Sequence, residues 1–176
     1  MSKIYVSPLS AVPDFVRRHK PSHLVTLLGP DTPIVTPEGF AAERHLKLVV
    51  HDIHEPAPDF IAPETAHVAE LLRFAGTWEQ KAPILIHCWA GISRSTAAAY
   101  ILLCNLNAPG AEAEIARALR HRAPHAQPNR LLVRHADALL GRGGRMIAAV
   151  EAMTPARSVW EGELFDLPLT PEELWS

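Results

Sequence analysis

The sequence is poor in cysteine, in long apolar runs and in excess charge of either sign. Two cysteines, Cys88 and Cys104, are too few for a disulfide framework, and free thiols are typical of a reducing cytoplasm. If a helix begins at Ser95, Cys104 lies about 13 Å along its axis, whereas a disulfide needs Cα atoms within roughly 4.4–6.8 Å. The longest apolar run, from Thr96 to Cys104, has about half of the ~20 residues that a transmembrane helix needs.

Neither a membrane nor a nucleic-acid partner is indicated. The first ten residues, MSKIYVSPLS, lack the apolar core of a secretory signal. The formal net charge of −2 argues against a nucleic-acid-binding protein, which usually carries a basic face. We therefore expect a cytoplasmic protein that binds neither membranes nor nucleic acid.

Histidine is frequent but follows no metal-binding spacing. Ten histidines are scattered along the chain, and the closest pair, His51 and His54, brackets Asp52. A metal site there needs further ligands that the sequence does not supply, so a polar loop is the preferred interpretation. The sequence thus predicts neither a metal nor another cofactor.

The order of the expected elements indicates the fold class. The 176 residues, 48% hydrophobic and 20% charged, suit one globular domain. Short apolar segments predict four strands, at Ile4–Val6, His23–Leu28, His45–Val50 and Ile84–His87. Helices are expected near Leu9–His19, from Pro63 to Gly76, and then at about Ser95–Asn105, Gly110–Arg120, Asn129–Leu140 and Arg145–Met153. Strands that alternate with helices and are followed by mostly helices predict an α/β fold with an open, largely parallel central sheet flanked by helices.

The C-terminal stretch differs from the rest of the chain. Residues 154–176 hold Trp160, Phe165, Trp175 and three prolines, and they show no clear period. We expect residues 1–153 to form a single domain and residues 154–176 to be a tail packed on that domain or on a partner chain. The sequence does not indicate the oligomeric state.

The segment from Cys88 to Arg94 combines groups that would bind and attack a phosphate. The strand Ile84–His87 delivers Cys88 to the carboxyl edge of the sheet, where α/β proteins bind their ligands. The positive N-terminus of the next helix favours the thiolate form of Cys88, which is the reactive species. Arg94 can hold two phosphoryl oxygens with its planar guanidinium. The backbone amides that can curl around the anion belong to the five residues Trp89, Ala90, Gly91, Ile92 and Ser93, in which Gly91 permits a tight path.

A simpler interpretation treats Cys88 as a buried hydrophobic residue and Arg94 as a solvated helix residue. It does not explain why a strand, a loop, a glycine, an arginine and a helix follow in this order. Cys104, which has no such surroundings, is best interpreted as a core residue.

The motif His87-Cys88-x-x-Gly91-x-x-Arg94-Ser95 resembles the HCxxGxxR(S/T) signature of the protein tyrosine phosphatase superfamily. The chain is similar to the compact, dual-specificity-like branch of that superfamily, from the strand at His23 to the helix near Leu140. The resemblance implies hydrolysis of phosphotyrosine, and also of phosphoserine or phosphothreonine, through a cysteinyl-phosphate. Cys88 would attack phosphorus, Arg94 and the loop amides would bind the phosphoryl oxygens, and Ser95 would hydrogen-bond the departing thiolate. Capping of the helix is an equally good role for Ser95.

The mechanism also needs a carboxylic acid that protonates the leaving oxygen. The resemblance implies a general acid on a loop some thirty-odd residues before the cysteine. Asp52 precedes Cys88 by 36 residues and directly follows a predicted strand, so we prefer it to Asp59, which lies deeper in the same loop. His87 would orient the loop and Trp89 would line the rim of the pocket, although ordinary packing explains either residue.

Two alternatives differ in substrate or in turnover. A phosphoinositide or inositol-phosphate phosphatase commonly carries lysines inside the signature loop, and this loop has no basic residue before Arg94. A phospho-binding module without turnover usually lacks the cysteine, the arginine or the acid, and this sequence has all three. A phosphorylated protein or a small phosphoester is therefore the expected binding partner.

Overall fold

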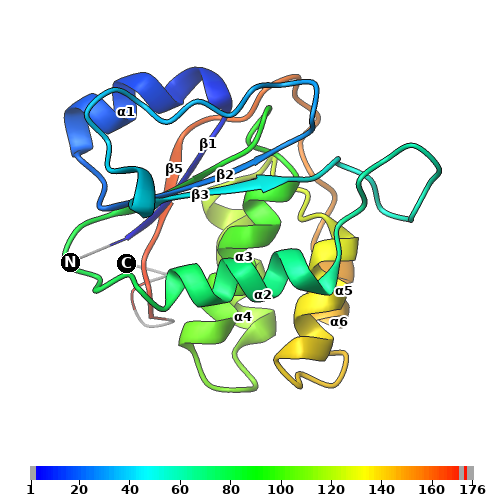
Figure 1. The fold of residues 1–176 in the computed structure, drawn as a ribbon. Helices are drawn as coiled ribbons and strands as arrows, with labels where there is room; N and C mark the ends of the chain where they lie inside the picture. The colour runs from blue at the N-terminus through cyan, green and yellow to red at the C-terminus, as the bar shows by residue number, and fades with distance from the viewer. Residues whose placement is uncertain (1–2, 171–172, 174–176) are drawn as a thin grey trace.

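A computed structural model describes residues 3–170 and residue 173 of the chain (Figure 1). A five-stranded sheet with the order β3-β2-β4-β1-β5 runs through the molecule. Its strands are β1 (Ile4–Ser7), β2 (His23–Leu28), β3 (His45–Val49), β4 (Ile84–His87) and β5 (Phe165–Leu167). Strands β1 to β4 are mutually parallel, and β5 is antiparallel to β1. The predicted α/β class and the four predicted strands are confirmed.

Helices cover the two faces of the sheet unequally (Figure 1). One face carries the short α1 (Val12–His19) and the loop that follows β2. The opposite face carries a layer of five helices: α2 (Thr65–Ala75), α3 (Arg94–Leu106), α4 (Glu112–Arg122), α5 (Arg130–Leu139) and α6 (Arg145–Glu151). Helix α3 is buried from Arg94 to Cys104 because it lies between the sheet and the other helices. It therefore places the residues at its N-terminus firmly at one edge of the sheet.

The starts of α1 and α2 differ from the expectation. Leu9–Ala11 forms a 3-10 helix, and α1 begins only at Val12, so that Pro13 lies in its first turn, where no amide is needed. Helix α2 begins at Thr65 rather than at Pro63. Glu64 is its N-cap, and the ring of His67 accepts a hydrogen bond from the Glu64 amide, which completes a capping box.

Strand β5 was not predicted from the sequence. Its register pairs Leu167 with Ile4 and Phe165 with Val6, and Asp166 forms an ion pair of 2.7 Å with Lys3. A three-residue strand leaves no periodic signal, and its partner lies at the other end of the chain. The expectation for Trp175 concerns a residue outside the described ones, and the division of the chain at residue 153 stays a prediction.

No helix in the described part of the chain is both long enough and apolar enough to cross a membrane.

Candidate active site

The loop between β4 and α3 lies at the carboxyl edge of the sheet and forms the candidate phosphate cradle. Gly91 in this loop has a φ of +69°, which strongly favours glycine. A Cβ at Gly91 would lie 2.6 Å from the nitrogen of Pro8 and 2.8 Å from the carbonyl carbon of Ser7. The glycine is thus needed because the cradle presses against the chain that leaves β1.

Cys88 is 2% exposed at the base of this loop. Its Sγ lies 3.1 Å from Oγ of Ser95, which is fully buried in the first turn of α3. Ser95 is therefore not the helix cap; that position belongs to Ser93, whose side chain makes no capping bond. The Ser95 hydroxyl instead faces the thiol.

Arg94 is 7% exposed, so it is not a solvated helix residue. One nitrogen, Nη1, donates a hydrogen bond of 2.8 Å to the carbonyl oxygen of Val50. Its buried Nε has no hydrogen-bond partner among the described residues. A buried guanidinium N–H without a partner is costly unless a ligand accepts from it, which makes Nε a donor suited to an anion.

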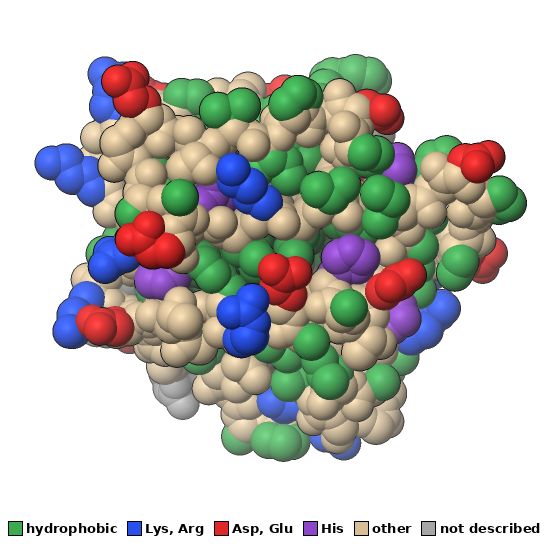
Figure 2. All heavy atoms as spheres, in the orientation of Figure 1, with side chains coloured by type: hydrophobic (Ala, Val, Ile, Leu, Met, Phe, Trp, Pro, Cys, Tyr) green, Lys and Arg blue, Asp and Glu red, His purple; other side chains and the backbone are tan. Residues whose placement is uncertain are grey.

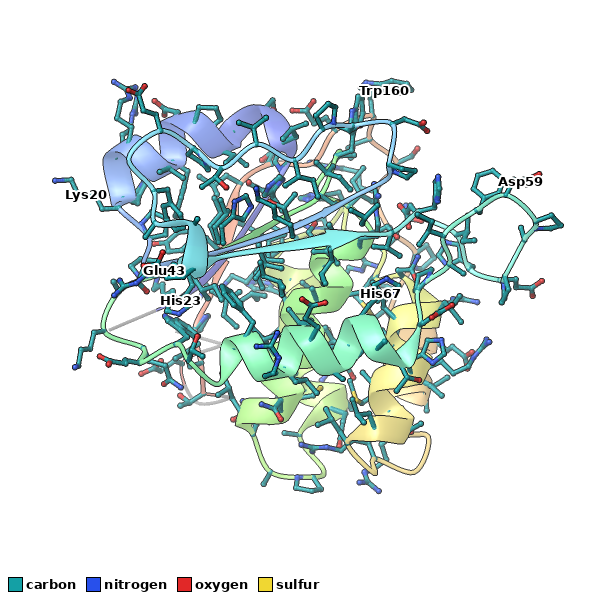
Figure 3. The ribbon with its side chains drawn as sticks, viewed as in Figure 1. Lys20, His23, Glu43, Asp59, His67 and Trp160 are labelled. Atoms are coloured by element: carbon teal, nitrogen blue, oxygen red, sulfur yellow. The ribbon has the colours of Figure 1, made fainter. Side chains whose placement is uncertain are left out.

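Asp52 comes from the loop after β3 and reaches the cradle. Its Oδ1 accepts a hydrogen bond of 2.6 Å from the hydroxyl of Ser93 and one of 2.9 Å from Nδ2 of Asn129. Asp59 lies farther along the same loop with a φ of +65°, and Figure 3 shows it at the tip, pointing away from the fold. The structure thus brings Asp52, and not Asp59, to the loop that holds Cys88.

Comparisons with known proteins agree with this geometry. The family described as protein-tyrosine phosphatase matches residues 42–127, which include Asp52 and the whole cradle. The predicted resemblance to the protein tyrosine phosphatase superfamily is confirmed for this part of the chain. No curated protein sequence gives a significant match.

Solved structures of phosphatases share the fold of this chain. DUSP15 superposes with a TM-score of 0.60 at 18% identity, over 87% of this chain and 97% of that one. The Yvh1 phosphatase domain from Chaetomium thermophilum gives 0.56 at 20% identity, over 81% and 93% of the two chains. Human DUSP28 gives 0.55 at 18% identity, over 80% and 95%. At these identities the likeness concerns the fold.

Asn129 is a residue of the candidate site that the sequence did not single out. It is fully buried and caps α5, because its Oδ1 accepts from the amides of Leu131 and Leu132, both at 3.1 Å. Its Nδ2 donates to Asp52 and, at 3.0 Å, to the carbonyl oxygen of Ile53. An asparagine before a predicted helix is a typical cap, and only the folded chain shows that its amide also holds the Asp52 loop.

A chain of four polar side chains leads away from the cradle on the α1 side of the sheet. Nδ1 of His87 lies 3.3 Å from the Cys88 carbonyl oxygen, and its Nε2 lies 2.6 Å from Oγ1 of Thr26. The same oxygen lies 2.8 Å from Nε2 of His45, whose Nδ1 lies 2.9 Å from Oγ1 of Thr36. Thr26, Thr36 and His87 line a cavity of about 970 Å³, whose lining does not include Cys88 or Arg94.

The carbonyl oxygen of Cys88, at one end of this series of side chains, fixes the directions of the hydrogen bonds. A carbonyl oxygen can only accept, so His87 donates from Nδ1 and accepts at Nε2. Thr26 must then donate to His87 and accept from Nε2 of His45, and Thr36 donates to Nδ1 of His45. Burial lowers the pKa of both imidazoles to about 4, so each is neutral at pH 7, as this order requires. The hydrogen bonds of His87 thus support its predicted role in orienting the loop.

The remaining predicted residues are placed as follows. Trp89 is 44% exposed at the rim of the cradle, and its ring lies edge-on to that of Trp160. His51 accepts a hydrogen bond from the Ile61 amide, so it closes the base of the Asp52 loop. Within the described part of the chain, no three His, Cys, Asp or Glu side chains are grouped as metal ligands. Cys104 is fully buried beside Tyr100, and burial raises the pKa of its thiol to about 12.

Proposed function

We propose that the chain is a phosphomonoester hydrolase that acts on phosphotyrosine, with phosphoserine and phosphothreonine as secondary substrates. One observation carries the proposal: a buried thiol, a guanidinium with a partnerless N–H and a carboxylate all meet at one loop. These are Cys88, Arg94 and Asp52. They supply a nucleophile, an anion clamp and an acid, which phosphoryl transfer through a covalent intermediate requires.

In the first step, the Cys88 thiolate attacks phosphorus and the bond from phosphorus to the ester oxygen breaks. Asp52, in its protonated form, transfers its proton to the leaving oxygen, so the alcohol or phenol departs neutral. The non-bridging oxygens carry charge throughout, and Arg94 together with the amides of residues 89–94 stabilises them. The product of this step is a cysteinyl-phosphate.

In the second step, water attacks the phosphoryl group and Asp52 takes up one of its protons. The phosphorus–sulfur bond breaks and inorganic phosphate leaves. The Ser95 hydroxyl, 3.1 Å from the Cys88 sulfur, donates a hydrogen bond to the thiolate as its charge returns. Cys88 and Asp52 are then in their starting states.

The cradle itself supports a monoester over a substrate with several phosphates. Residues 89–93 contain no lysine or arginine that would meet a second phosphate. The presence of Cys88, Arg94 and Asp52 in one site supports turnover over phosphate binding alone. Both cysteines are free, which supports a reducing compartment such as the cytoplasm, where the Cys88 thiol stays available.

The test is turnover of p-nitrophenyl phosphate and of a phosphotyrosine peptide from pH 5 to pH 8. The wild type is compared with Cys88→Ser, Asp52→Asn and Asp59→Asn. We expect Cys88→Ser to abolish turnover but to keep phosphopeptide binding, and Asp52→Asn alone to remove the basic limb of the pH profile. If Asp59→Asn removes that limb, the acid is wrongly assigned; if the wild type binds phosphopeptide without hydrolysing either substrate, the proposed function is wrong.

A further inference from the structure

Two tryptophans lie unshielded at the rim of the cradle. Trp89 directly follows Cys88, and 44% of its surface is exposed. Trp160 comes from the segment after α6, and 83% of its surface is exposed. The two ring centroids are 6.1 Å apart with an angle of 89° between the ring planes, an edge-to-face pair. Figure 3 shows Trp160 extending outward from the fold.

The segment that carries Trp160 is fixed to the cradle. The amide of Gly162 donates a hydrogen bond of 2.8 Å to the carbonyl oxygen of Ala90, inside the cradle. A Cβ at Gly162 would lie 2.6 Å from Nε2 of His125 and 3.0 Å from the Gly91 carbonyl oxygen, so this contact accepts no side chain. Trp160 therefore keeps its place beside the cradle, and its exposure does not come from a loose chain.

Large aromatic side chains that stay exposed beside a ligand site are typical of interaction surfaces. Tryptophan offers a wide apolar face at a low cost in side-chain entropy, and it is enriched among the residues that dominate binding energy. Because Trp160 is 83% exposed, most of its indole surface is available for contact. The pair begins one residue from the candidate nucleophile, so a molecule with its phosphate in the cradle lies next to it.

The loop of residues 51–62, at the same edge of the sheet, is acidic. It contains Asp52, Glu55 and Asp59 and no lysine or arginine. Glu55 and Asp59 are exposed, as are Phe60 and Ile61, and Figure 2 shows this protruding loop with acidic and hydrophobic side chains. Such a loop repels an anionic membrane surface or a nucleic acid and attracts a basic peptide.

We propose that Trp89 and Trp160 form a docking platform for a phosphorylated peptide segment of a protein. The platform receives an aromatic or large aliphatic side chain that flanks the phosphorylated residue, while Glu55 and Asp59 favour basic residues in the same segment. This inference rests on the proposed phosphatase function and names the kind of substrate which that site selects.

The test uses two phosphotyrosine peptides that share one arginine and differ only in the residues beside the phosphotyrosine, Phe in one and Ala in the other. The ratio of their kcat/KM values measures selectivity for the flanking residues. Turnover of p-nitrophenyl phosphate, which has no such residues, measures the hydrolysis step alone. We compare the wild type with Trp160→Ala, Trp160→Phe and Val35→Ala. The last variant is the control, because it removes an apolar side chain that is 77% exposed but is not part of the tryptophan pair. We expect Trp160→Ala to lower the Phe-to-Ala ratio about tenfold, Trp160→Phe to restore part of it and Val35→Ala to leave it unchanged.

Dissociation constants of both peptides for Cys88→Ser, with and without Trp160→Ala, report on the platform even without turnover. A wild-type ratio near one, or an unchanged ratio in Trp160→Ala, overturns the platform while activity on p-nitrophenyl phosphate upholds the phosphatase. Absence of all turnover, with peptide selectivity intact in Cys88→Ser, overturns the phosphatase and upholds the platform. In a further outcome, the wild type binds phosphatidylserine vesicles and Trp160→Ala loses that binding, while peptide selectivity stays the same. That result would show that the tryptophans bind a membrane, and it would overturn the proposal.

Discussion

The carboxylate of Asp52 accepts a hydrogen bond of 2.6 Å from the hydroxyl of Ser93, although 41 residues separate the two in the sequence. Ser93 immediately precedes Arg94 in the cradle, and Asp52 follows β3 on a separate loop. The candidate acid and the candidate phosphate site are thus positioned relative to each other by one direct contact. Substitutions that loosen the contact should affect proton transfer more than phosphate binding.

Asn129→Ser tests the support that holds Asp52. Serine is also a good N-cap, so α5 keeps its cap, while the amide donors to Asp52 and to the Ile53 carbonyl are lost. General acid catalysis contributes about 10²–10⁴-fold, and a misplaced acid should lose about tenfold of it in kcat for a phosphotyrosine peptide. p-Nitrophenyl phosphate has a better leaving group and should be affected less. An equal loss with both substrates would contradict a positioning role.

Gly91→Ala tests the contact between the cradle and the chain that leaves β1. The new Cβ would lie 2.6 Å from Pro8, so the cradle must move, and we expect kcat/KM to fall at least about 100-fold. Gly39→Ala is the matched control, because Gly39 also has a positive φ, +74°, but a Cβ at that position would meet nothing within 4 Å. Steady-state kinetics and isothermal titration with phosphate measure both variants. Similar losses in the two would assign the effect to the backbone angle alone.

His45 should make the stability of the fold depend on pH. Burial, and then the neighbouring positive charge of Lys47, lower its pKa from 6.5 to about 4, so the unfolded chain binds the proton more readily. The stabilisation is complete above pH 6.5 and is lost as pH falls toward 4, at up to about 1.4 kcal/mol per pH unit. His45→Gln should flatten this slope in urea denaturation at pH 7, 6 and 5. Parallel curves for the two proteins would refute the assignment.

Glu112 should be among the most sensitive positions for stability. It is 2% exposed, accepts a hydrogen bond of 3.0 Å from the buried Arg142 and another of 2.8 Å from the Gly110 amide. Removal of one partner leaves a buried charge, so Glu112→Ala should lower the free energy of unfolding by about 3–5 kcal/mol. Asp14→Ala breaks only exposed ion pairs on α1 and should cost far less. Chemical denaturation compares them, and equal costs would count against the buried pair.

Much of the fold was predictable because its central strands, β2 and β4, are buried on both faces. The segments His23–Leu28 and Ile84–His87 are short apolar runs, and the structure has strands with these same bounds. The cradle was predictable because all its parts lie within one local segment. Strand β5 was not, because three residues gain their stability from pairing with β1 and not from their own pattern.

The supporting side chains could not be found in the sequence for the same reason. Three separate elements contribute Asn129, Thr26 and His45. The local sequence around each of them predicts only an ordinary helix cap or strand residue. Only the packing of β2 beside β3 and β4 aligns Thr26 with His87, and only the approach of α5 brings Asn129 to Asp52. Contacts between residues so far apart in the sequence produce no spacing pattern from which they could be predicted.

The pairing of β5 with β1 also bears on how the protein is made. Lys3 and Asp166, which form an ion pair, are 163 residues apart, so this edge of the sheet closes only after all the elements between them have left the ribosome. Contacts of such long sequence separation form late in folding. Gly162, which reaches the cradle through Ala90, emerges just before β5. A nascent chain can therefore carry every reactive group and still lack a finished site until residues 162–167 have emerged.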